Sequence, residues 1–302
     1  MPKPALVLTQ RDIEIILMVY FYDGVLISHL RRKFWPNVLS HTSYYRRIKK
    51  LIEAGYLKGS SSEPFTKADR IWLTVGPSAR PLLSQWLGVS GHQLQTTTKT
   101  TSPFIVAHRA AVGDVRLSLE LSAQIYPWIR FLEWQSEGEL ARVPMQVTEQ
   151  VKHQEKTESV TRYILPDGAF NITTNTHSFR AFVEVDMGTI PHRLSQKLRD
   201  YLIFEKEIKP KIPVLFIVQD NFRMQKDRAK SILKWAQEAA LGLGMSSEIF
   251  WIAKRADISE QTILTSPIWQ VAGRPGELQK LPIPYIPQLV PSEEHTHTQP
   301  SL

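Results

Sequence analysis

Residues 43–57 read SYYRRIKKLIEAGYL, and this stretch decides the fold of the first third of the chain. Its apolar side chains, among them Tyr44, Ile48 and Leu51, recur at helical spacing and predict an amphipathic helix with one buried stripe. Gly55 is the residue that ends such a helix, because glycine adopts the left-handed conformation without strain. A short strand is expected directly after it.

Two more helices precede this one, and a hairpin follows it. Thr9 is the expected N-cap of a helix that ends at Gly24, and residues 28–34 predict a second, shorter helix. A polar loop over residues 59–69 leads to residues 71–75, whose alternating pattern predicts the returning strand. Three helices followed by a two-stranded hairpin are the plan of a winged helix-turn-helix, and the opening stretch closely resembles the recognition helix of that family.

When the apolar stripe faces inward, the opposite face of the third helix carries side chains that reach base edges and phosphates in a major groove. These residues are Thr42, Ser43, Tyr45, Arg46, Arg47 and Lys50. Lys67 and Arg70, in and beside the wing, are expected to contact the DNA backbone. Double-stranded DNA is therefore the expected partner, and a palindromic site would require a homodimer. The alternative is a winged helix used for protein docking.

The positive charge of the chain is concentrated in the same region. The 302 residues include 37 Lys plus Arg and 29 Asp plus Glu, which gives a net charge of +8. Residues 1–88 hold 13 of these basic and 6 of these acidic residues, so +7 of the charge lies there. No acidic residue occurs between Gly24 and Ile52. Such an excess indicates a polyanionic partner, the alternative being a solvated basic face without function.

Composition excludes several classes of protein. The chain has no cysteine, which excludes a disulfide framework, a thiolate nucleophile and Cys-ligated zinc and fits a reducing cytoplasm. Its 42% apolar and 22% charged residues are those of an ordinary globular protein. No apolar stretch approaches the roughly 20 residues needed to cross a bilayer, and the first residues lack the apolar core of a signal peptide. We therefore expect a soluble cytoplasmic protein with no membrane partner.

Changes in composition along the chain divide it into four parts. Residues 1–88 form the expected DNA-binding domain, and residues 89–103, rich in Thr, Gln and Ser, read as a linker. Residues 104–265 are expected to form a second domain. Residues 266–302 are rich in proline and predict an irregular C-terminal extension.

The second domain alternates helical and strand-like segments, which predicts a mixed α/β sheet. The expected helices and strands follow in chain order: helix 104–124; strands 128–134, 161–165, 169–172 and 179–186; helix 190–207; strand 212–218; helix 226–243; and strand 248–253. The second of these helices has Thr189 as its expected cap and Pro191 in its first turn.

Three carboxylates in this domain are the residues that indicate chemistry. Asp167 lies at a turn between two short strands, and Glu184 and Asp186 end the next strand, where they point to the same face. Carboxylates that converge at strand ends form the hard oxygen site that holds Mg²⁺ and activates water for phosphodiester hydrolysis. The sequence therefore predicts Mg²⁺ as a cofactor, with these three residues as ligands.

This order of residues resembles the PD-(D/E)XK nuclease superfamily, in which an Asp and a downstream Glu or Asp bind metal and a Lys two residues later orients the attacking water. Asp167 and Glu184 match that pattern, while Asp186 occupies the position of the lysine. Lys197 borders the apolar stripe of the following helix, so it could face the sheet as a migrated lysine. The catalytic residues implied by the resemblance are these four.

An alternative keeps the fold without the chemistry. In a degenerate nuclease fold, the same carboxylates would cap turns or pair with Arg180 and Arg193.

The chain as a whole resembles the replication-relaxation family over roughly residues 9–253. The resemblance depends on the winged helix, on Ala107-His108-Arg109, on the Pro-Asp step, on FVEVDMGT at residues 182–189 and on KLRDY at residues 197–201. It implies a part in replication or DNA relaxation of a plasmid or mobile element, with other replication or mobile-element proteins as partners.

Three functions from different classes follow from these observations. The favoured one is a DNA-binding protein of a plasmid or mobile element, acting in replication or relaxation through a winged helix and a nuclease-like domain that is active or degenerate. The second is a Mg²⁺-dependent nicking or cleaving endonuclease. The third is a winged-helix transcriptional repressor.

Overall fold

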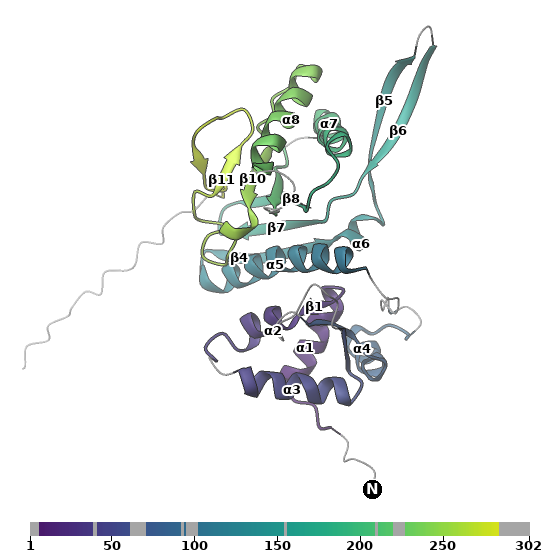
Figure 1. The fold of residues 1–302 in the computed structure, drawn as a ribbon, viewed down its shortest axis with the longest axis vertical. Coiled ribbons are helices and arrows are strands. Elements are labelled where there is room, and N and C mark those ends of the chain that lie inside the picture. Colours follow the sequence, from purple (N-terminus) through teal and green to yellow (C-terminus); the bar gives the residue numbers. More distant parts are fainter. Residues whose placement is uncertain are drawn as a thin grey trace, which may run out of the picture.

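The structure is a computed structural model, and it describes residues 6–38, 41–60, 71–91, 94, 102–153, 156–208, 211–219 and 227–283. It contains a small helical N-terminal part and a larger α/β part, with the long helix α5 (Pro103–Ile125) between them (Figure 1). The predicted mixed α/β class is confirmed. In the described residues, no helix is long and apolar enough to cross a membrane.

The N-terminal part has the predicted order of three helices and a hairpin, with two short additions. Its elements are α1 (Gln10–Phe21), β1 (Val25–Leu26), α2 (Ile27–Phe34), α3 (His41–Glu53), β2 (Leu57–Ser60), β3 (Trp72–Val75), a 3-10 turn (Pro77–Ala79) and α4 (Arg80–Leu87). The strands form an antiparallel sheet in the order β1-β3-β2. The strand β1 and the helix α4 are not predicted by the sequence patterns; β1, with two residues, is too short to show a period.

Local sequence fixes both ends of α1. Thr9 caps the helix as predicted: its side chain accepts from the Asp12 amide, and the Asp12 carboxylate accepts from the Thr9 amide at 2.6 Å. At the other end Gly24 has a φ of +111°, and a Cβ there would lie 2.3 Å from the Trp72 ring. Glycine at this position therefore lets the chain turn tightly against the hairpin.

The α/β part is built around one seven-stranded sheet in the order β12-β11-β10-β9-β8-β7-β4. The strands β8, β9 and β10 run parallel, and the other pairs are antiparallel. The elements that follow α5 are β4 (Ile129–Ser136), α6 (Glu137–Leu140), β5 (Met145–His153), β6 (Lys156–Ile164), β7 (Gly168–Thr174), β8 (Ser178–Asp186), α7 (Pro191–Glu207), β9 (Val214–Val218), α8 (Arg228–Leu243), β10 (Phe250–Lys254), a 3-10 turn (Arg255–Asp257), β11 (Trp269–Val271) and β12 (Leu278–Gln279).

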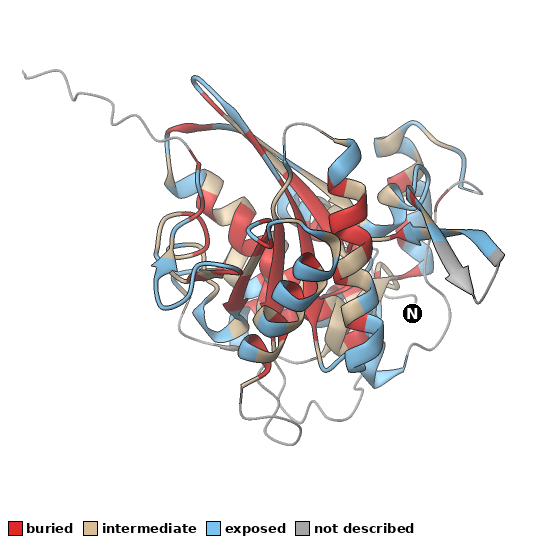
Figure 2. Cartoon of the chain, turned by 90° about the horizontal axis from the view of Figure 1, so that it is seen from above, coloured by how far each residue is buried: buried red, intermediate tan, exposed pale blue. Residues whose placement is uncertain are grey.

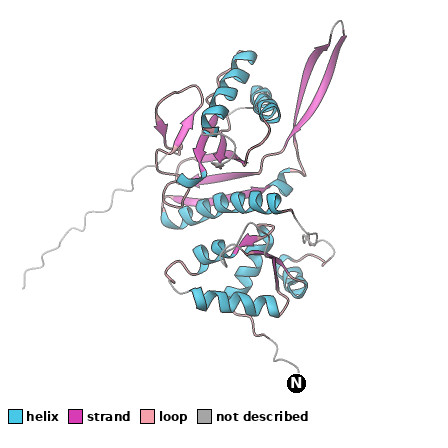
Figure 3. Cartoon of the chain, viewed as in Figure 1, coloured by secondary structure: helices cyan, strands magenta, loops and turns pink. Residues whose placement is uncertain are grey.

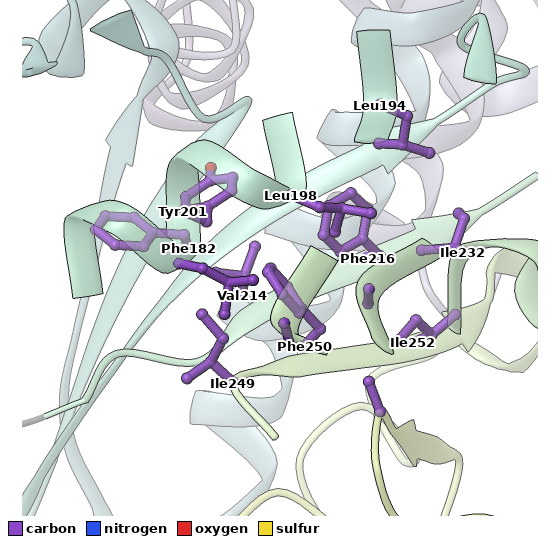
Figure 4. Close-up of a cluster of buried hydrophobic side chains, with 14 of the residues drawn as sticks. Phe182, Leu194, Leu198, Tyr201, Val214, Phe216, Ile232, Ile249, Phe250 and Ile252 are labelled. Atoms are coloured by element: carbon purple, nitrogen blue, oxygen red, sulfur yellow. The ribbon is translucent and has the colours of Figure 1, made fainter. Parts of the chain in front are cut away.

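Helices cover both faces of this sheet, so its central strands are buried (Figure 2). On the face covered by α7 and α8, Phe182, Phe216 and Phe250 pack with helix residues such as Leu198 and Ile232 (Figure 4). The opposite face packs against α5 through a second apolar cluster. That cluster includes Ala111, Val115, Val183, Val185, Leu215 and Ile217. Alternation along β8 thus supplies two cores at once.

Three expectations for this part differ from the structure. The strands β5 and β6 pair only with each other and form a ribbon that projects from the body (Figure 3), and β5 is not predicted by the sequence. The α7 cap is Ile190, without a side-chain hydrogen bond, and not Thr189. Residues 266–283, expected to be irregular, add β11 and β12 to the sheet edge, because Trp269 and Val271 are buried there.

The two parts of the chain are joined by ion pairs between α2 and α5. The buried His29 ring lies 2.9 Å from Asp114 Oδ1, and Arg32 Nη1 lies 3.3 Å from the same oxygen. Arg255, in the 3-10 turn after β10, also binds Asp114. Lys33 donates to Glu120 at 2.6 Å. The basic side of α2 is therefore occupied by the acidic side of α5.

We expect Asp114→Ala to destabilise the chain by about 1–3 kcal/mol at pH 7, because it leaves the buried His29 without its partner. Burial opposes ionisation of Asp114, but the hydrogen bond from His29 and the charge of Arg255 hold its pKa well below its usual value of 3.8. The Asp114 carboxylate therefore stabilises the fold fully above pH 3.8, and this stabilisation is lost as the pH falls below 3.8 toward the native pKa.

Thermal unfolding followed by circular dichroism at pH 7 and pH 3 measures both effects. Asp257→Ala, which removes an exposed carboxylate, is the control. Equal melting temperatures for Asp114→Ala and the wild type at pH 7 would show that the α2–α5 network does not contribute to stability.

Candidate active site and nucleic-acid interface

Asp167 and His108 meet at the start of β7. Asp167 Oδ2 accepts a hydrogen bond from the Val185 amide at 2.7 Å and lies 3.2 Å from the His108 ring. The ring comes from the face of α5 that covers the sheet. The hydrogen bond to the Asp167 carboxylate raises the pKa of His108, although burial lowers it. Asp167 is thus held between β8, through the Val185 amide, and α5, through the His108 ring.

Glu184 precedes Val185 on β8 and points to the opposite face of the sheet, toward α7. It is 4% exposed. Lys197 donates to its Oε2 at 2.6 Å and to the Leu165 carbonyl at 3.2 Å, and the Tyr201 hydroxyl donates to its Oε1 at 2.5 Å. Burial raises the pKa of Glu184 to about 7; the charge of Lys197 opposes this rise, and that of Asp167 adds to it.

Lys197 faces the sheet, as its place on the helical wheel predicts. Burial lowers the pKa of its ammonium, but the charges of Glu184 and Asp167 outweigh burial and raise it. The side chain keeps 31% of its surface exposed. A cation is therefore fixed against Glu184 and feels the charge of Asp167, on a side chain that is only partly buried.

Asp186 does not belong to this group. Its carboxylate accepts from Arg228 at 2.7 and 3.1 Å and from the Thr189 amide at 3.0 Å. Burial raises the pKa of Asp186, but these hydrogen bonds outweigh it and lower the pKa. The predicted convergence of three carboxylates is therefore wrong, because α8 brings a buried arginine to the third one.

The alternative partners, Arg180 and Arg193, are not those that the structure gives to these carboxylates. Arg180 donates to Gln135.

The smaller set still fits Mg²⁺ in its chemistry. Among the residues that the structure describes, no three His, Cys, Asp or Glu side chains are grouped closely enough to hold a metal ion. Mg²⁺, however, commonly keeps several waters and uses only one or two carboxylates together with substrate phosphates. Asp167 and Glu184 are two such carboxylates, near enough for the charge of one to raise the pKa of the other.

The third helix presents the predicted polar face. Tyr44, Ile48 and Leu51 are buried at 1% exposure or less, while Tyr45 is 38% exposed. The other exposed side chains of this face are Thr42, Ser43, Arg46, Lys49 and Lys50. The helix therefore has one apolar and one basic, hydroxyl-bearing side.

Arg47 is an exception on this helix. Its guanidinium binds both oxygens of the buried Asp12 carboxylate on α1 and donates to the Val7 carbonyl at 3.0 Å. The prediction of an exposed Arg47 is wrong, because the capping carboxylate of α1 needs a cation. Lys67 and Arg70 lie outside the described residues.

Two members of the site were missed from the sequence. His108 and Tyr201 each belong to a motif of the family resemblance, Ala107-His108-Arg109 and KLRDY, to which no role in the site is assigned from the sequence. One signal could have found Tyr201: it lies four residues after Lys197, so both side chains share a helix face.

The fold and the site define a mixed α/β protein with a buried carboxylate–lysine centre. A family model described as replication-relaxation matches residues 27–214, from α2 to the start of β9. The chain therefore belongs to the replication-relaxation family, as its motifs predict.

Comparison with individual proteins adds little to this assignment. No curated protein matches the chain. Among solved structures, the restriction endonuclease FokI aligns with 82% of this chain at 9% sequence identity and a TM-score of 0.22. The chain covers 42% of that protein.

We expect Glu184→Gln to remove a pH-dependent cost of folding. A carboxyl group with a raised native pKa binds more protons in the native state than in the unfolded state. The stability of the wild type therefore falls as the pH rises from 4.5, the usual pKa of a glutamate, to about 7, the native pKa of Glu184. At about 1.4 kcal/mol per pKa unit, the stability of the wild type relative to the variant should fall by roughly 3 kcal/mol across this window.

Urea unfolding of both proteins at pH values from 4.5 to 8.5 measures the difference. Glu53→Gln, at an exposed carboxyl, should show no comparable trend. A constant difference between wild type and Glu184→Gln would contradict the raised pKa.

Proposed function

We propose that this chain binds double-stranded DNA through α3 and acts in the replication or relaxation of a plasmid or mobile element. The observation that carries the DNA-binding proposal is the division of α3 into a buried apolar stripe and an exposed face with Ser43, Arg46 and Lys50. Membership of the replication-relaxation family supports the role in replication or relaxation.

The distribution of paired charges also supports α3 as the contact element. Arg32 and Lys33 on α2 are bound by Glu260 and Glu120, and Arg47 by Asp12. The exposed basic side chains of α3 have no such carboxylates from other elements in the ion pairs of the described residues; Lys49 approaches only Glu53, at 3.9 Å, on its own helix. Phosphates would supply the missing anions.

Arg46→Ala and Lys50→Ala are each expected to weaken binding to duplex DNA by on the order of tenfold, with a salt dependence that is less steep by about one released counterion. Fluorescence anisotropy of a labelled duplex of mixed sequence, titrated at several salt concentrations, measures both quantities.

Lys234→Ala is the matched control, because Lys234 is an exposed helical lysine with a Glu four residues later, on α8. Equal losses in Lys234→Ala and in the α3 variants would contradict a specific role for α3.

A second candidate function, metal-dependent nicking of DNA, is favoured by the contact between Lys197 and Glu184. In this proposal Asp167 and Glu184 would hold Mg²⁺, which would supply Lewis-acid activation of water and phosphate. The partly exposed Lys197 side chain would orient the water or the phosphate. Tyr201 fixes the rotamer of Glu184 through the second carboxylate oxygen.

Supercoiled plasmid incubated with the protein and Mg²⁺ or Mn²⁺ tests this candidate. We expect conversion to nicked circles that EDTA abolishes and that Asp167→Asn and Glu184→Gln reduce at least a hundredfold. Asp257→Asn, at an exposed carboxyl, should retain the activity. No conversion by a wild-type protein that binds the plasmid would eliminate nicking and leave a DNA-binding factor.

A further inference from the structure

The β5–β6 ribbon is the largest feature that the proposed function does not use. Its strands pair in register from Met145 opposite Ile164 to His153 opposite Lys156, and they belong to no other sheet of the described residues. Nine residues per strand give a length of about 30 Å. The ribbon extends away from the body of the molecule (Figure 3).

The inner face of the ribbon is used by the fold. Directly paired residues of an antiparallel ribbon point to the same side, and successive residues alternate. Val147 and Ile164 are buried near the base, in the core shared with α7. Arg162 binds Asp200 at 2.8 Å and Glu149 at 2.6 Å, which ties the same face to α7.

The outer face has a different character. Its described side chains are Gln146, Thr148, Gln150, Thr157, Ser159, Thr161 and Tyr163, and all are exposed. Thr148 and Thr161 lie side by side, with their hydroxyl oxygens 3.3 Å apart. Every one of these side chains carries a hydrogen-bonding group, and none is acidic or aliphatic. Glu149 and Glu158 alternate to the inner face.

This surface fits the major groove of duplex DNA better than an apolar partner. A two-stranded ribbon has the width that the major groove admits, and Gln, Ser and Thr are side chains that bond to base edges there. Because the described side chains of the outer face include no acid, none of them repels phosphates. On the described outer face, the ring of Tyr163 is the only large apolar surface that an apolar protein or a lipid membrane could contact.

The ribbon is also rooted at the candidate site. The strand β6 ends at Ile164, three residues before Asp167, and the intervening Leu165 carbonyl accepts from Lys197. The base of the ribbon is therefore connected to the carboxylate–lysine centre through Leu165. The α3 surface belongs to the other part of the molecule, beyond α5 (Figure 1).

We infer that the outer face of the β5–β6 ribbon is a second DNA-binding element, which enters the major groove. The inference rests on the proposed function only in taking duplex DNA as the partner. Gln146 and Gln150 are the side chains that would bond to adenine edges, with the threonines between them.

The absence of cysteine allows a direct test on the full chain. Thr161→Cys places one thiol on the outer face, and Gln237→Cys places one on the exposed side of α8 as the matched control. A saturating mixed-sequence duplex should slow maleimide labelling of Thr161→Cys at least fivefold and leave Gln237→Cys unchanged. The double variant Gln146→Ala/Gln150→Ala should bind the duplex about tenfold more weakly, and these exposed changes should not alter its thermal stability.

The outcomes separate this inference from the role of α3. Unchanged labelling of Thr161→Cys, in a protein whose DNA binding Arg46→Ala weakens, overturns the ribbon and keeps α3. Slowed labelling with no effect of Arg46→Ala supports the ribbon and overturns α3. Failure of the wild type to bind duplex overturns both. Labelling that slows with protein concentration in the absence of DNA identifies a second copy of the chain as the occupant and overturns the inference.

Discussion

Two carboxylates on one buried strand impose the constraint on which the rest of the α/β part depends. Glu184 and Asp186 lie on β8 at 4% and 3% exposure, between a sheet neighbour and two helices. A carboxylate taken out of water without a partner costs several kcal/mol, so each one requires a cation of its own. The helix α7 supplies Lys197 to the first, and α8 supplies Arg228 to the second. The positions of both helices over the sheet are therefore specified by charge as well as by apolar packing.

The helix α5 also combines apolar packing with paired charges, and it connects the two parts of the molecule. Its apolar side covers the sheet, and its acidic side receives the basic residues of α2. His108, also on α5, reaches Asp167 at the strand ends. The helix α5 thus contacts both the N-terminal part, through α2, and the Asp167 end of the carboxylate–lysine centre. The charge excess of the N-terminal part is reduced by these contacts, and the exposed basic residues of α3 are among those that remain.

Local periodicity predicted what depends on neighbours in the sequence. The three N-terminal helices, the buried side of α3 and the direction of Lys197 all follow from a period of 3.6 residues. The partners of Arg47 and Asp186 could not be predicted from this period, because Asp12 and Arg228 lie 35 and 42 residues away in the sequence. The strands β11 and β12 were not predicted for another reason. They are too short to show an alternating pattern, and the buried Trp269 fixes their position at the sheet edge. What the sequence left undetermined was pairing across the fold, on which the carboxylate site depends.

The two buried ion pairs differ in one respect that bears on function. Arg228 is 8% exposed, and it also binds the Thr189 carbonyl, so the Asp186 pair is closed to any ligand. Lys197 is 31% exposed, and its Glu184 partner has a pKa near neutrality. Solvent weakens the attraction within such a pair but spares its charges part of the cost of desolvation. The Lys197 side chain keeps part of its surface exposed, beside a carboxyl group whose pKa is about 7. This asymmetry favours a ligand at Glu184 and a purely structural role at Asp186.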